Sequence, residues 1–92
     1  MSVVTVRIPT PLRAATGGAA EVVCKGATIA EVVDDLERQH PGIKERICEP
    51  DGSIRRFVNV FLGDEDIRFL DGVNTRVDDG ASMSIIPAVA GG

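Results

Sequence analysis

Apolar and polar residues alternate strictly at the start of the chain, and again a short distance further on. Val4, Val6 and Ile8 occupy every second position, which is the spacing of a strand with one buried face. In the second run, residues 21–25, Val22 and Cys24 fall on one face. Prolines 9 and 11 end the first run, and Gly17-Gly18 lies between the two. The pattern predicts two strands joined as a hairpin with a long loop.

The helical period appears once, directly after Gly26. Thr28 and Glu31 have the spacing of a capping box, in which each side chain satisfies a free amide at the helix start. Pro41-Gly42 ends the pattern. Because adjacent valines are poor helix formers, packing on a sheet must supply the stability. The predicted buried stripe is Ile29, Val32, Val33 and Leu36.

Alternation returns in the second half of the chain. Residues 57–62 predict a strand, Ile67–Phe69 a short strand, and residues 82–86 a final strand. The expected core positions of the two longer strands are Val58, Val60, Leu62, Met83 and Ile85. Period two then places the intervening residues on the opposite face: Phe57, Asn59, Phe61, Ser84 and Ile86.

The order of these elements is strand, strand, helix, strand, short strand, strand. One helix can cover only one face of the sheet, and the most apolar strands, the first and last, are expected to be central and parallel. This describes an α+β fold of the β-grasp, or ubiquitin-like, type: a mixed sheet with one main helix on one face. We expect one domain over residues 1–92, with residues 87–92 as a flexible, free C-terminal tail.

The chain closes on Val89, Ala90, Gly91 and Gly92. Pro87 has no amide hydrogen and would end the sheet ladder just before this segment. Two glycines without β-carbons fit a channel too narrow for side chains. The tail therefore indicates chemistry on the carboxylate of Gly92, with Gly91 needed for passage.

Composition removes several classes of function. The formal charge of −4 argues against nucleic acid as a partner. No apolar run reaches the length of a membrane span and no signal peptide is evident, so we expect no membrane contact and a cytoplasmic location. Cys24 and Cys48 lack metal-ligand spacing, and two cysteines cannot ligate the cluster of a β-grasp ferredoxin. We therefore predict no metal and no bound cofactor.

Several segments together resemble the ThiS/MoaD-type sulfur carriers, most closely the carriers of an actinobacterial cysteine-synthesis pathway. The resemblance runs over nearly the full length, and the C-terminal run is its most specific part. The segment from Gly42 to Arg56 makes this chain longer than the thiamine carriers. The matching segments are Val6–Thr10, the capped helix, Arg56–Asn59, Asp64–Phe69 and Ile86–Gly92.

The resemblance implies that an E1-like adenylyltransferase uses ATP to adenylate the Gly92 carboxylate, and that sulfur then replaces AMP to give a thiocarboxylate. The covalent sulfur would pass to an accepting synthase, cysteine-synthase-like or another thiolating enzyme, and a metalloprotease is a further possible partner. The chain would be a co-substrate and not an enzyme. Which acceptor it serves stays open between cysteine, molybdopterin, thiamine and sulfur-containing natural products.

Partner enzymes are expected to grip the open face at the root of the tail, through Phe57, Phe61 and Ile86, together with Val89 and Ala90. Two alternatives remain at this point. One is a ubiquitin-like modifier joined to lysines of target proteins. The other is a β-grasp interaction module whose tail has no chemical role.

Overall fold

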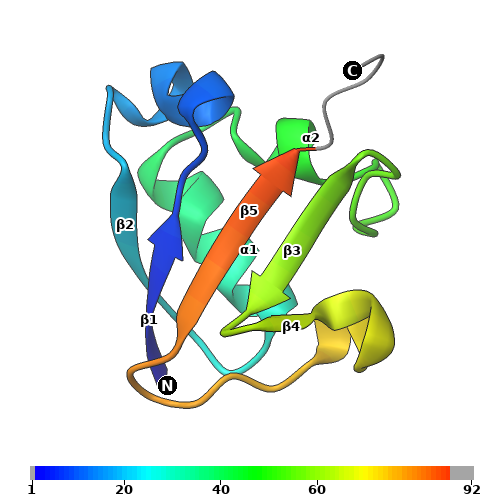
Figure 1. Ribbon diagram of the computed structural model, residues 1–92. Coiled ribbons are helices and arrows are strands. Elements are labelled where there is room, and N and C mark those ends of the chain that lie inside the picture. Colours follow the sequence, from blue (N-terminus) through cyan, green and yellow to red (C-terminus); the bar gives the residue numbers. More distant parts are fainter. Residues whose placement is uncertain (1, 88–92) are drawn as a thin grey trace.

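The computed structural model describes residues 2–87 (Figure 1). Its helices are α1 (Ile29–Gln39) and α2 (Lys44–Ile47), with the 3-10 helices η1 (Thr10–Thr16), η2 (Ile67–Phe69) and η3 (Gly72–Asn74). Its strands are β1 (Ser2–Arg7), β2 (Glu21–Gly26), β3 (Val58–Leu62), β4 (Glu65–Asp66) and β5 (Ser82–Pro87).

The strands form one sheet in the order β2-β1-β5-β3-β4. β1 and β5 run parallel, with Val6 opposite Met83, and the other neighbouring pairs are antiparallel. The predicted element order, the β1–β2 hairpin and the parallel pairing of the first and last strands are confirmed. This arrangement is the β-grasp fold.

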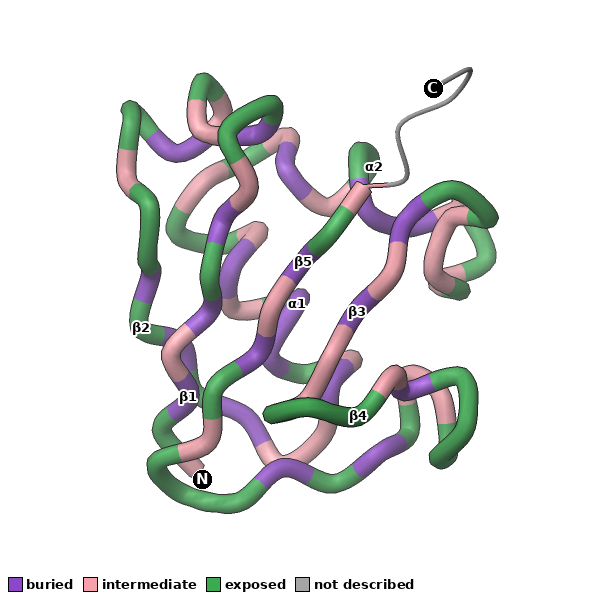
Figure 2. The backbone as a smooth tube through the Cα atoms, viewed as in Figure 1, coloured by how far each residue is buried: buried purple, intermediate pink, exposed green. Residues whose placement is uncertain are grey.

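Helix α1 packs on one face of the sheet and lies behind it in the view of Figure 1. The whole predicted helix stripe is buried, as are the predicted inward residues of β1, β2 and β5. Ile43, the residue before α2, and Ile47, the last residue of α2, are also fully buried. On β3, Val58 and Val60 are buried, whereas Leu62 is half-buried against the core. The predicted core face is therefore confirmed, and it appears as the alternating purple segments in Figure 2.

The start of α1 is fixed by a variant of the predicted capping box. The Glu31 amide donates to Oγ1 of Thr28 over 3.3 Å, as expected. The Glu31 carboxylate, however, accepts from the amide of Ala27 at 3.0 Å, one residue before the N-cap. Gly26, the last residue of β2, lies so close to α1 that an added Cβ would sit 2.8 Å from the Val32 amide nitrogen. A glycine is therefore required where strand and helix meet.

The prediction of a strand at Ile67–Phe69 is wrong. The paired segment is β4, just before it, and residues 67–69 form the helix η2. The carboxylate of Asp66 accepts from the Arg68 amide at 2.9 Å and caps this turn. Only Ile67 is buried, while Phe69 is 87% exposed. A half-buried strand would need a second inward residue at position 69, but Phe69 points to solvent and the capped turn holds only Ile67 in the core.

Side chains form hydrogen bonds with main-chain groups at both outer parts of the sheet. On β2, the side-chain amide of Gln39 donates to the Val23 carbonyl at 3.0 Å, and the Asp35 carboxylate accepts from the Lys25 amide at 2.9 Å. Beside β3, the Arg68 guanidinium donates to the backbone carbonyls of Arg56 and Val58. Both edges are thus partly closed by side chains.

Candidate functional site

The candidate site lies at the end of the sheet where β5 stops. Pro87 is the last described residue and faces Val58, the first residue of β3. α2 lies at the same end of the molecule (Figure 1). The predicted reactive and tail residues lie outside the described residues: Val89, Ala90, Gly91 and Gly92.

Of the three described residues that were predicted to bind partners, Phe61 and Ile86 lie on the open face of the sheet, and Phe57 lies in the turn before β3, which begins at Val58 and not at residue 57. Phe57 is 60% exposed and Ile86 is 47% exposed, whereas Phe61 is half-buried. Ile86 lies opposite Asn59, and Phe61 follows Asn59 on the same face of β3, whereas Phe57 lies in the turn just before β3. Cross-strand and diagonal neighbours of this kind are within reach of one another. We call Phe57, Phe61 and Ile86 the apolar patch.

The segment that carries Phe57 is held from outside the sheet by Arg68. One guanidinium nitrogen, Nη2, donates to the Val58 carbonyl at 2.8 Å and to the Arg56 carbonyl at 3.1 Å. The Arg56 guanidinium carbon lies 5.5 Å from the centre of the Phe57 ring, in cation–π range. Sequence reasoning did not identify Arg68, because it was assigned to a strand that does not exist.

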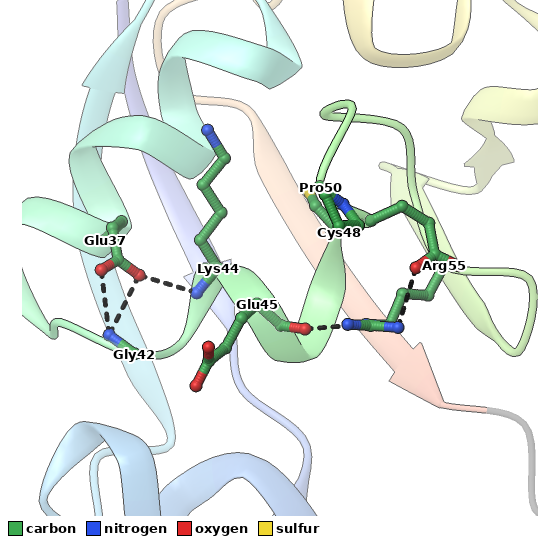
Figure 3. A pocket seen from close by; sticks show the side chains of 8 residues that line it. Glu37, Gly42, Lys44, Glu45, Cys48, Pro50 and Arg55 are labelled. Atoms are coloured by element: carbon green, nitrogen blue, oxygen red, sulfur yellow. Dashed lines mark hydrogen bonds and ion pairs between the residues drawn. The ribbon is translucent and has the colours of Figure 1, made fainter.

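A pocket of about 440 Å³ lies beside α2 and is shown in Figure 3. The Glu37 carboxylate accepts from the backbone amides of Gly42 and Lys44, and these bonds lower the pKa of the Glu37 carboxyl. Arg55 donates to the Glu45 carbonyl at 2.7 Å and to the Glu49 carboxylate at 2.9 Å. Arg55 therefore ties the segment before β3 to α2 and to Glu49. The Glu37, Glu49 and Arg55 side chains in this pocket are therefore hydrogen-bonded within the protein.

Neither cysteine is placed to act as a nucleophile. Both are free and buried. Burial raises the pKa of the Cys24 thiol to about 11, and the Asp35 carboxylate adds to the rise. Burial also raises the pKa of Cys48. Since the thiolate is the reactive form, both residues belong to the core and not to a reaction centre.

The described residues also offer no metal centre or membrane helix. Among residues 2–87, no three His, Cys, Asp or Glu side chains lie close enough to hold a metal ion. No helix in that range is long and apolar enough to cross a bilayer.

Comparison with known proteins places this fold and this tail in one family. The ThiS family model matches residues 6–92. The chain is 50% identical over 91 residues to the sulfur carrier protein CysO of Mycobacterium tuberculosis, covering 97% of this chain and 98% of that protein. It is 39% identical over 66 residues to the small archaeal modifier protein 3 of Haloferax volcanii, covering 72% of this chain and 71% of that protein.

A solved structure agrees with the sequence match. The crystal structure of the Amycolatopsis orientalis BexX/CysO complex contains a chain with 50% identity and a TM-score of 0.92, covering 97% of this chain and 99% of that one. The resemblance predicted from the sequence is confirmed. This chain belongs to the ThiS family, and it is a sulfur carrier protein rather than an enzyme in itself.

Proposed function

We propose that the sulfur is carried on the carboxyl group of Gly92, as a thiocarboxylate, and is donated from there to a biosynthetic acceptor. The observation that carries this proposal is the family match, which runs to residue 92 and so includes Gly91-Gly92. In this proposal the chain is a co-substrate, and the reactive group is its own carboxyl terminus rather than either buried cysteine.

The proposed loading reaction has two steps. An E1-like partner joins the Gly92 carboxylate to the α-phosphorus of ATP, forming an acyl-adenylate and releasing pyrophosphate. A sulfide equivalent then attacks the carbonyl carbon, a C–S bond forms, and the C–O bond to AMP breaks. Adenylation is needed because a free carboxylate has no good leaving group. The use of ATP by this partner is consistent with a cytoplasmic site of action.

The apolar patch is the proposed docking surface for the activating enzyme and for the sulfur acceptor. It lies on β3, on β5 and on the turn before β3, next to Pro87, and so borders the root of the tail. A partner that holds the root of the tail raises the effective concentration of the carboxylate in its active site. The acceptor is a synthase of the cysteine-synthase type or another thiolating enzyme, and a metalloprotease acting on the C-terminus is a further partner.

The test is intact mass spectrometry after incubation with ATP, an E1-like enzyme and sulfide. We expect the mass to rise by the difference between sulfur and oxygen, with fragmentation placing the change at Gly92. Gly92→Leu and Gly91→Leu should remain unmodified, because a large side chain blocks the channel. Ala14→Leu, which adds the same side chain at an exposed position far from the C-terminus in sequence, is the matched control and should be loaded normally.

A different product would overturn the proposal. An adduct in which Gly92 is joined to a lysine of another protein would favour a modifier, the role named for the Haloferax volcanii relative. Full sulfur delivery by a chain lacking Gly91 and Gly92 would favour an interaction module whose tail has no role.

A further inference from the structure

We infer that Arg68 is a positioning residue for partner binding: it holds the backbone on both sides of Phe57 and so fixes the exposed aromatic ring at the root of the tail. This inference rests on the proposed function, because it concerns the same docking surface. It starts from the two carbonyls that Arg68 occupies, those of Arg56 and Val58.

The start of β3 needs support from outside the sheet. Val58 pairs with Pro87 at a position of the ladder where the main-chain groups of Val58 point away from β5, and β4 pairs only with Phe61 and Leu62. The Val58 amide donates to the Arg55 carbonyl at 3.0 Å, within its own turn. The Arg68 guanidinium supplies a donor to the Val58 carbonyl on the side of β3 that β4 does not reach.

Arg68 is itself well anchored. Its amide donates to the Asp66 carboxylate at 2.9 Å, and the neighbouring Ile67 is buried in the core. The Leu70 amide donates to the Ile67 carbonyl at 3.0 Å and closes the turn. The turn η2 is therefore well anchored, and the Arg68 guanidinium extends from it to the start of β3.

Phe57 gains a defined position from this arrangement. The ring is 60% exposed, so packing alone does not hold it. Its backbone is fixed on both sides by Arg68, and the Arg56 guanidinium lies over its face. An exposed aromatic group whose position is set before binding loses less conformational freedom when a partner takes it up. Removal of Arg68 should therefore weaken docking without changing the chemical step.

The experiment compares Arg68→Met, Arg68→Lys and Arg76→Met in the full chain. Methionine keeps much of the apolar stem but has no donors. Lysine has rotatable donors on one nitrogen and restores part of the bonding. Arg76→Met makes the same charge change at a side chain with no hydrogen bond or ion pair to the described residues. All measurements are made where circular dichroism shows each variant folded.

Two readouts are needed. Hydrogen exchange of the free protein should show the Val58 amide exchanging at least about tenfold faster in Arg68→Met, less so in Arg68→Lys, and unchanged in Arg76→Met. In loading by the E1-like enzyme, KM for Arg68→Met should rise about three- to tenfold with kcat unchanged. Unchanged exchange, or a fall in kcat with KM unchanged, would overturn the inference. If even the unaltered chain is not loaded, the proposed function fails, while the exchange result still decides whether Arg68 holds this segment.

Discussion

The two faces of the sheet are built from the same strands and have opposite properties. On the face covered by α1, the inward residues of β1 and β5 are almost completely buried, Val4 and Met83 among them. On the open face, one residue along each strand, Val23 is 58% exposed and Ile86 is 47% exposed (Figure 2). Both faces carry apolar side chains, so hydrophobicity alone does not separate them. The difference is that one face has a helix of this chain to cover it.

The covered face accounts for stability, and we propose that the open face serves recognition. Each buried aliphatic side chain contributes roughly 1.5–3 kcal/mol through loss of contact with water. Apolar side chains on the open face gain that energy only when another molecule covers them. The same alternation therefore encodes both the core and the candidate docking surface, and three changes would test this division.

The largest effect is expected from Leu36→Ala on the covered face. Leu36 is fully buried, and its truncation should lower the free energy of unfolding by about 2–5 kcal/mol. Urea unfolding followed by circular dichroism measures this. Phe69→Ala is the control, because Phe69 is 87% exposed and its loss should change stability by less than about 0.5 kcal/mol. Equal losses in the two variants would contradict the division between the faces.

The second test uses Cys24, whose pKa is raised from 9.0 to about 11 by burial beneath α1. The folded state holds the thiol proton more tightly than the unfolded state does. This contribution to stability is therefore complete below pH 9 and is lost as the pH rises through about 11. The total loss should be about 2–3 kcal/mol.

Urea unfolding at about pH 8 and about pH 10.5 measures this contribution in the unaltered chain and in Cys24→Ala. The difference between the two pH values should be smaller for Cys24→Ala, since alanine does not titrate. The same alkaline loss in both proteins would show that Cys24 is not in a dry environment.

The smallest effect on stability is expected on the open face. Phe57→Ala and Ile86→Ser should weaken binding of the E1-like enzyme by about 1–3 kcal/mol and change unfolding by less than about 0.5 kcal/mol. Isothermal calorimetry and thermal unfolding measure the two quantities. Val23→Ser is the matched control, because Val23 is also exposed on the open face but lies on β2. A comparable loss of binding in Val23→Ser would mean that the contact is not confined to the apolar patch.

The sequence alone predicted most of the architecture because the core follows simple periods. Apolar residues that recur with period two in a strand, or with helical spacing in a helix, lie on one face of that element. Val6, Leu36 and Met83 are examples, and all three are buried in the core. The parallel pairing of β1 and β5 followed from their apolar content and from having only one helix. The apolar patch was predicted by the same alternation, although Phe61 is more shielded than expected.

The parts that were not predicted depend on particular hydrogen bonds and turns rather than on a periodic pattern. The alternation of Ile67 and Phe69 around Arg68 gave no sign that Asp66 would cap a turn there. Arg68 reaches carbonyls ten and twelve positions earlier in the chain, a contact that no local pattern encodes. In the same way, η1 was missed because a segment between prolines and glycines has no helical period.

The side chains along the sheet edges also limit how this protein can be recognised. An unpaired strand edge offers a template for β-augmentation, by which another extended chain adds itself to the sheet. Here Gln39 and Asp35 occupy groups on β2, and Arg68 occupies carbonyls beside β3. These sites are closed both to strand-to-strand aggregation between copies and to partners that bind by strand addition. A carrier that must leave one enzyme and meet the next benefits from contacts made by a few side chains, since a shared sheet would release it slowly.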